Sequence, residues 1–137
     1  MKNIQLLVLD VDGTMTDGGV YYDDHGNETK KFAIKDGAAL VLAHAAGLQV
    51  MICTGRECPA VARRAADCGD DLNDLAAMSL CGFVSCPADA CSEVRQRADY
   101  ICPQKGGEGA VRGMVEKILR SSGRWQQAVQ KAFGADV

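Results

Sequence analysis

The sequence has no long apolar run, no excess of positive charge and only two histidines. A helix that crosses a bilayer needs about 20 consecutive apolar residues, so the first absence argues against a membrane protein. The formal net charge of −3 argues against nucleic acid or an anionic membrane surface as the main partner. The apolar run at the start leads straight into a cluster of acids, which indicates a core strand rather than a signal peptide. We therefore expect a cytoplasmic protein.

The chain also lacks any C-x-x-C pair, although it contains seven cysteines. Cys81, Cys86 and Cys91 recur at five-residue intervals, which matches no common zinc spacing. The histidines, His25 and His44, are too few and too scattered for a metal cluster. In a reducing compartment such cysteines behave as small buried hydrophobes and a few exposed thiols, so we expect no zinc site.

Apolar and helix-forming segments alternate along the 137 residues, of which 47% are hydrophobic and 24% charged, a composition typical of one soluble domain. Short apolar runs predict strands at 4–9, 48–53, 83–86 and 100–102, and helices are expected at 37–46, 59–67, 72–80, 88–98, 109–120 and 125–133. The segment 19–33 predicts two strands around a turn at 24–27. This alternation indicates an α/β fold, a parallel sheet covered on both faces by helices.

The first apolar run stops abruptly at Asp10-Val11-Asp12-Gly13-Thr14. A buried strand that ends in acid, acid and glycine brings two carboxylates to the edge of a sheet. Carboxylates this close repel each other unless a cation or a shared proton offsets their charge. A divalent metal with an anionic substrate would explain them, with one aspartate as nucleophile and the other as general acid and base. The alternative is a solvated turn after a strand, where Asp and Gly are common.

Five stretches resemble the haloacid dehalogenase superfamily of phosphohydrolases, and within it the small, capless branch of 3-deoxy-D-manno-octulosonate 8-phosphate (KDO 8-phosphate) phosphatases. They occur in the family's order at 10–18, 32–37, 52–56, 69–74 and 105–112, with the sequences DVDGTMTDG, FAIKDG, ICTGR, GDDLND and KGGEGAVR. The resemblance implies a single domain over 1–137: a three-layer, Rossmann-like parallel sheet with a β-hairpin flap at about 19–33. In this branch the flap helps to build a homotetramer.

The resemblance also assigns roles to individual residues. Asp10 is the implied nucleophile, which forms an aspartyl-phosphate, and Asp12 protonates the leaving alkoxide and then activates water. The Asp10 side chain, the Asp12 backbone carbonyl and Asp70 would hold Mg²⁺, a cation that prefers oxygen ligands. The expected substrate-binding residues are Asp12, Ala33, Ile34, Lys35, Asp36, Gly37, Thr54, Gly55, Arg56 and Arg64.

Several of these substrate assignments have a plainer alternative. Thr54-Gly55-Arg56 also fits an ordinary strand-to-helix turn, and Arg64 fits a solvated helix face. Arg56 is the candidate for a sugar acid carboxylate, because a guanidinium pairs with a carboxylate through two hydrogen bonds. Family members often carry arginine where Lys35 stands. The loop 106–109 can simply start the long helix that follows, and Trp125 is expected to pack rather than to take part in chemistry.

One stretch departs from the family pattern. Only fifteen residues separate Thr54 from Asp70, and no apolar run precedes Gly69-Asp70. A parallel connection needs a dozen or more residues of crossover and then another strand. We therefore predict an internal deletion that removes central strands and leaves the strand of Asp10 without a normal neighbour on one side. The deletion would also remove the superfamily's phosphate-binding lysine, for which Lys35, Lys105 and Arg56 are the nearby candidates.

Together these features predict a Mg²⁺-dependent phosphatase that hydrolyses a sugar acid phosphate, with KDO 8-phosphate of lipopolysaccharide synthesis as the leading candidate. A phosphatase for a nine-carbon, sialic-acid-type 9-phosphate is the close competitor. A different class of protein, a non-catalytic and oligomer-forming relative that retains the motifs, is also compatible. A phosphate- or nucleotide-binding domain without hydrolysis is a third possibility, but the chain has no G-x-G-x-x-G or P-loop.

Overall fold

A five-stranded parallel sheet forms the centre of the computed structural model, which describes residues 4–53, 65–69 and 71–137. Its order is β4-β1-β5-β6-β7, and every neighbouring pair is parallel. The strands are β1 (Leu6–Asp10), β4 (Gln49–Cys53), β5 (Ala65–Cys68), β6 (Phe83–Cys86) and β7 (Tyr100–Ile101). The chain adds β4 on one side of β1 and then returns to the other side, so the strand order reverses at β1. Four of the five strands lie where the apolar runs predict them.

The fifth strand, β5, corrects the prediction that β1 has a normal neighbour on only one side. It occupies part of the segment 59–67 that was expected to be helical, and it pairs in parallel with β1 and with β6. A four-residue strand between two others satisfies its backbone groups through both neighbours, so it forms without a long apolar run. In the part of the chain that the structure describes, β1 is therefore paired on both sides. Residues 59–64 lie outside that part.

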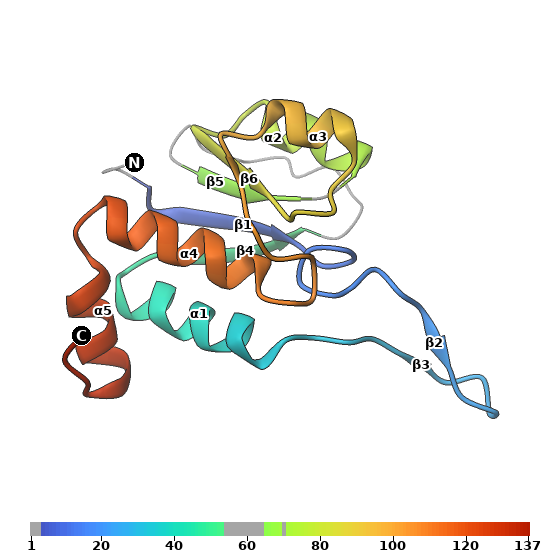
Figure 1. The fold of residues 1–137 in the computed structure, drawn as a ribbon, viewed down its shortest axis with the longest axis horizontal. Coiled ribbons are helices and arrows are strands. Elements are labelled where there is room, and N and C mark those ends of the chain that lie inside the picture. Colours follow the sequence, from blue (N-terminus) through green and yellow to red (C-terminus); the bar gives the residue numbers. More distant parts are fainter. Residues whose placement is uncertain (1–3, 54–64, 70) are drawn as a thin grey trace.

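Helices cover both faces of the sheet, as Figure 1 shows. On one face lie α1 (Ile34–Ala45), α4 (Ala110–Ser121) and α5 (Trp125–Phe133); on the other lie α2 (Leu75–Met78) and α3 (Ser92–Arg97). A short 3₁₀ helix, η1 (Leu72–Asp74), leads into α2. The three-layer α/β fold is thus confirmed. None of the helices that the structure describes is long and apolar enough to cross a membrane.

Strand alternation divides the interior into two apolar clusters. Leu7 and Leu9 of β1 belong to the larger cluster with α1, α4 and α5, where side chains such as Met114 and Ile118 are fully buried. Val84 and Cys86 of β6 face the other way, into the smaller cluster formed with α2 and α3. Successive side chains of a strand point to opposite faces, so a buried sheet needs an apolar cluster on each side.

The single tryptophan packs at the junction of α4 and α5. The guanidinium groups of Arg112 and Arg120 lie 5.3 and 4.3 Å from the centroid of the Trp125 ring. Glu116, between these arginines on α4, accepts hydrogen bonds from both of them. This arrangement confirms the expectation that Trp125 serves packing, because cation–π contacts and the apolar cluster account for its surroundings.

The predicted hairpin is present and projects away from the body of the molecule (Figure 1). Its strands, β2 (Tyr21–Tyr22) and β3 (Glu28–Thr29), are antiparallel, and all residues from 20 to 30 are exposed. An isolated two-stranded hairpin is marginal in water. Its role as a contact between subunits stays a prediction.

Two neighbouring residues of α1 provide a test of this packing. Leu42 is 1% exposed in the larger cluster, whereas Val41 is 49% exposed. We expect Leu42→Ala to lower the free energy of unfolding by about 2–5 kcal/mol, because it removes buried methyl groups and leaves a cavity. Val41→Ala, the matched control, should change it by less than about 0.5 kcal/mol. Urea denaturation of both variants measures the difference, and equal losses would contradict the assignment of this helix face to the core.

Candidate active site

The candidate site lies where the carboxyl ends of β1, β4 and β5 meet. Asp10, the last residue of β1, is opposite Cys53 of β4, and Leu9 is opposite Cys68 of β5. Thr54 follows Cys53 directly in the sequence, and Asp70 is two positions after Cys68. In open parallel sheets, ligands bind at the carboxyl ends of strands at the point where the strand order reverses. That point is β1 here, and β4 and β5, which precede the two later motifs in the sequence, end at the same edge as β1.

The first acidic motif, residues 10–18, lies in a tight loop that follows β1 and is called the acidic loop below. The carbonyl oxygen of Val11 accepts hydrogen bonds from the N–H groups of Thr14, Met15 and Thr16, at 3.4, 3.0 and 3.0 Å. The buried hydroxyl oxygen of Thr16 accepts two more, from the N–H groups of Gly13 and Gly18, each at 3.2 Å. Gly13 has a φ of +91°, which favours glycine. These bonds fix the backbone between the two aspartates and the hairpin.

The two aspartates of this loop have different surroundings. Asp10 is buried, with 6% of its surface exposed, at the end of a strand that is paired on both sides. The side chain of Asp12 is 60% exposed and forms an ion pair with Lys30, whose Nζ lies 2.5 Å from Oδ1. One carboxylate is therefore held in the protein interior and the other faces the mouth of the site. This difference suits a fixed nucleophile and a proton donor that must reach a leaving group.

Lys30 is a site residue that the sequence analysis missed. It follows β3, and the hydrogen bond that it donates to Asp12 is the main reason that the pKa of its ammonium is raised, with Glu28 and Asp10 contributing through their charges. No sequence pattern signals this contact, because the two residues are 18 positions apart and meet only through the register of the hairpin.

A second loop packs directly on the acidic loop. The N–H of Gly107 donates to the carbonyl oxygen of Thr14 at 3.1 Å. A Cβ atom on Gly106 would lie 1.7 Å from the carbonyl oxygen of Gly13, and one on Gly107 would lie 2.4 Å from the amide nitrogen of Asp17. The two backbones are therefore too close for any side chain. The loop 105–109 thus does more than start α4, because its backbone packs against the backbone of the acidic loop.

Lys35 and Asp36 were both expected to line the site, but their side chains lie differently. Lys35 is exposed, and its stem passes so close to Gly109 that a Cβ there would lie 2.7 Å from the lysine Cε. Asp36 is 2% exposed, and its Oδ1 accepts the N–H of Arg112 in the first turn of α4 at 2.9 Å. Burial raises the pKa of this carboxyl group. The Asp36 side chain thus joins α1 to α4. This is a structural position, whereas the sequence analysis expected a substrate-binding one.

The remaining predicted residues divide into two sets. Ala33 precedes α1, Ile34 is 94% exposed, and Gly37 is exposed with open space where a Cβ would point. Ala33 is thus the N-cap of α1, and Ile34 and Gly37 lie in its first turn. The other predicted positions lie outside the described residues: Thr54, Gly55, Arg56, Arg64 and Asp70. Within the described ranges, no group of three or more His, Cys, Asp or Glu side chains could hold a metal ion, so the predicted ligand set depends on Asp70.

The buried cysteines behave as the sequence analysis expects. Cys86 and Cys102 are fully buried, and burial raises the pKa of their thiols to about 11 and about 12. At neutral pH both thiols are therefore protonated, which makes them unreactive packing groups.

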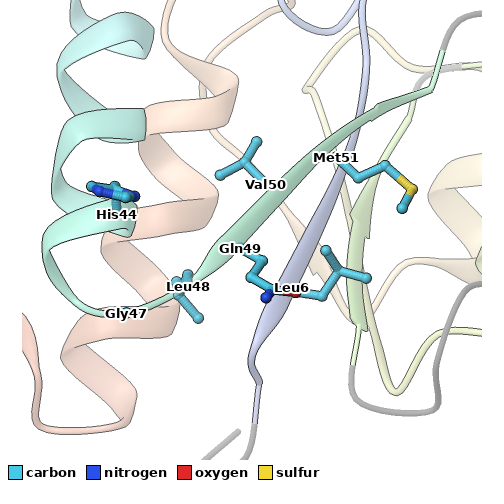
Figure 2. A pocket seen from close by; sticks show the side chains of 7 residues that line it. All are labelled: Leu6, His44, Gly47, Leu48, Gln49, Val50 and Met51. Carbon is cyan, nitrogen blue, oxygen red and sulfur yellow. The ribbon is translucent and has the colours of Figure 1, made fainter.

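A hollow of about 630 Å³ lies at the other end of the sheet. It is lined by Leu6, His44, Gly47, Leu48, Gln49, Val50 and Met51, as Figure 2 shows. Leu6 and Gln49 are the first residues of β1 and β4, so this hollow is at the amino ends of the strands. It is separate from the acidic loop, and we do not assign the site to it.

Comparison with known proteins decides the family. No family model matches the chain. The chain is 31% identical over 157 residues to 3-deoxy-D-manno-octulosonate 8-phosphate phosphatase KdsC from Haemophilus influenzae, covering 90% of the chain and 87% of that protein. The chain belongs to the KDO 8-phosphate phosphatase family. The predicted enzyme class, the phosphoric monoester hydrolases, is confirmed at the level of the family.

Solved structures agree with this membership. A HAD (haloacid dehalogenase) superfamily, subfamily III A, hydrolase from Legionella pneumophila matches with a TM-score of 0.89 at 29% identity, covering 98% of the chain and 92% of that structure. The KDO 8-phosphate phosphatase of Moraxella catarrhalis, in complex with a magnesium ion, a phosphate ion and KDO, matches with a TM-score of 0.83 at 30% identity, covering 90% of each chain. The predicted superfamily and fold are thereby confirmed.

The length of the alignment bears on the departure noted above. The match to the H. influenzae phosphatase runs over 157 positions, more than the 137 residues of this chain, so some of its positions have no counterpart here. Their place along the chain is not fixed by this count, and the deletion between Thr54 and Asp70 stays a prediction. The pairing of β5 with β1 shows that the sheet is continuous across this stretch.

The contact between the two loops can be tested at Gly106. We expect Gly106→Ala to lower the free energy of unfolding by about 1–3 kcal/mol and to reduce turnover, because the new methyl group displaces the acidic loop. Gly123→Ala is the comparison variant: Gly123 has a φ of +72° and nothing within 4 Å of an added Cβ, so it tests backbone strain alone. Urea denaturation and steady-state kinetics measure both effects, and normal turnover in Gly106→Ala would contradict the supporting role of the loop.

The buried carboxyl group of Asp36 predicts a pH dependence of stability. Its pKa is raised above the ordinary value of 3.8, so the folded state binds the proton more tightly than the unfolded state. The contribution to stability is fully present below pH 3.8 and is lost as the pH rises through the raised pKa. We expect the native chain to lose stability relative to Asp36→Asn across this window, as measured by urea denaturation between about pH 3 and pH 7. Asp24→Asn, in the exposed hairpin turn, serves as control, and a pH-independent difference for Asp36→Asn would contradict the prediction.

Proposed function

We propose that this chain is a Mg²⁺-dependent phosphatase that hydrolyses a sugar acid phosphate, with KDO 8-phosphate as the leading substrate. The observation that carries the proposal is the placement of a buried Asp10 and an exposed Asp12, two residues apart, where the strand order of a parallel sheet reverses. Membership in the KDO 8-phosphate phosphatase family supports the substrate class.

The two aspartates divide the reaction between them. A carboxylate oxygen of Asp10 attacks the phosphorus atom and forms an acyl phosphate, while the bond from phosphorus to the sugar oxygen breaks. Asp12 donates its proton to the leaving alkoxide, which departs as the sugar hydroxyl. The Asp12 carboxylate then removes a proton from water, which attacks the same phosphorus atom. Inorganic phosphate leaves, and both aspartates return to their starting states.

The donor set at this edge fits a magnesium ion. Asp10 offers a carboxylate and Asp12 a backbone carbonyl, and Mg²⁺ binds oxygen ligands with near-octahedral geometry. We propose Asp70 as the third protein ligand on the strength of the sequence motif. When bound, the metal neutralises charge on the phosphoryl oxygens. The M. catarrhalis relative, which contains magnesium and phosphate, supports this choice of ion.

The substrate would enter between the acidic loop and the start of α1. The exposed Lys35 ammonium is placed to meet an anionic group, and Thr54, Gly55, Arg56 and Arg64 are proposed to complete the binding surface. The KDO molecule in the M. catarrhalis structure supports an eight-carbon sugar acid. A cytoplasmic location and a homotetramer assembled through the hairpin also belong to the proposal, the latter supported by the exposed Tyr21 and Tyr22.

The decisive experiment compares the native chain with Asp10→Asn. We expect Mg²⁺-dependent release of phosphate from KDO 8-phosphate by the native chain, and a loss of at least about 1,000-fold in kcat for Asp10→Asn, because the amide is a poor nucleophile. The change is nearly isosteric, so the melting temperature should stay similar.

Two further comparisons complete this test. Chelation of the metal should abolish turnover, and N-acetylneuraminate 9-phosphate should be hydrolysed more slowly than KDO 8-phosphate. Equal rates for the native chain and Asp10→Asn would instead support the non-catalytic alternative, and faster hydrolysis of the nine-carbon substrate would replace the leading one.

A further inference from the structure

The ion pair between Lys30 and Asp12 connects the root of the hairpin to the loop that follows β1. The ammonium Nζ of Lys30 donates to Oδ1 of Asp12 at 2.5 Å, and it also lies 3.8 Å from Oε1 of Glu28. Glu28 begins β3 and Lys30 follows that strand directly, so both carboxylates lie close to one ammonium. The lysine is thus held between two carboxylates, one of them the proposed proton donor.

The hairpin register explains why the lysine reaches this far. Tyr21 is opposite Thr29 in the hairpin, whereas Thr16 is opposite Phe32 in an isolated bridge nearer the body. The four residues 17–20 on one side therefore face only Lys30 and Lys31 on the other. On the longer side, the Asp17 carboxylate accepts hydrogen bonds from the Gly19 N–H and the Tyr21 hydroxyl. On the shorter side, Lys30 contacts Asp12 of the acidic loop. Extra residues on one strand can change the direction of a side chain in this way, as they do at a β-bulge.

The ion pair between Lys30 and Asp12 is not explained by a contribution to the stability of the fold. The Lys30 and Asp12 side chains are 32% and 60% exposed, and ion pairs at such positions contribute little to stability. The pair does, however, restrict the orientation of the Asp12 carboxylate, which is largely exposed after β1. The consequence of the contact is therefore expected in the chemistry that depends on this orientation.

We propose that Lys30 is a positioning residue for Asp12: by donating to Oδ1 it orients the carboxyl group so that Oδ2, which carries the proton in the acid form, meets the leaving sugar alkoxide. This inference rests on the proposed phosphatase function and adds a residue outside the five recognised motifs. It makes the hairpin part of the catalytic apparatus within one chain, because its register brings Lys30 to Asp12.

The nature of the leaving group distinguishes positioning from a structural role. A sugar alkoxide is a poor leaving group that needs the proton of Asp12, whereas p-nitrophenolate leaves readily without one. An error in the orientation of Asp12 should therefore slow hydrolysis of KDO 8-phosphate much more than that of p-nitrophenyl phosphate. A general distortion of the site should slow both alike.

The experiment compares Lys30→Gln, Lys30→Arg and Lys31→Gln at saturating Mg²⁺. Lys31 is the matched control, an exposed lysine next in sequence. For Lys30→Gln we expect kcat on KDO 8-phosphate to fall by about tenfold or more with a smaller change in KM, since misplacement by about 1 Å can cost a hundredfold. On p-nitrophenyl phosphate the fall should be less than about threefold. Lys30→Arg keeps a charged donor and should recover most of the lost rate, and Lys31→Gln should behave as the native chain.

The outcomes separate this proposal from the one on which it rests. Equal losses on both substrates, or equal behaviour of Lys30→Gln and Lys31→Gln, would overturn the positioning role while leaving the phosphatase intact. Absence of Mg²⁺-dependent turnover by the native chain would overturn both proposals. Melting temperatures control for folding. If Lys30→Gln does not fold, Lys30→Arg decides: equal losses of kcat on KDO 8-phosphate and on p-nitrophenyl phosphate in that variant would overturn the positioning role.

Discussion

The parallel pairing of β1 on both of its sides is the constraint on which the rest of the molecule depends. With β4 along one edge and β5 along the other, the strand has no freedom to shift, and its last residue must lie in the interior of the carboxyl edge of the sheet. That position is what buries Asp10. The chain turns directly after this position, where the Val11 carbonyl oxygen accepts the N–H groups of Thr14, Met15 and Thr16. The placement of the Asp10 carboxylate thus follows from backbone pairing alone.

Support for the acidic loop comes from segments distant in the sequence, and it relies on the absence of side chains. Gly106 and Gly107 allow two backbones to approach at a distance that no Cβ would permit. Asp36 then links the start of α1 to the first turn of α4, which carries this glycine loop. In this way the larger apolar cluster, through α1 and α4, sets the position of a polar loop at its margin. The position of the acidic loop thus depends on the packing of the core.

The sequence was sufficient for most of the fold and for the position of Asp10 and Asp12 at the end of β1, and its failures have physical causes. Apolar runs and acidic motifs located β1, β4, β6 and β7, because in these segments burial and local pattern agree. β5 was mistaken for helix because Arg63-Arg64-Ala65-Ala66 favours helix locally, and only pairing with two neighbouring strands makes part of this segment a strand. Asp36 was assigned to substrate binding by its motif, although its side chain instead accepts a hydrogen bond from a residue 76 positions away in the sequence. Lys30 was missed for a similar reason, since it meets Asp12 only through the hairpin register.

The uneven root of the hairpin has one further consequence, which concerns the parity of chain length. Four residues between Thr16 and Tyr21 face two between Thr29 and Phe32, a mismatch of an even number. Because side chains alternate along a strand, an even mismatch leaves the same faces opposed at both paired positions, Tyr21–Thr29 and Thr16–Phe32. An odd mismatch would place opposite faces against each other. A single residue inserted between Lys30 and the bridge would therefore turn the ammonium to the opposite face, away from Asp12.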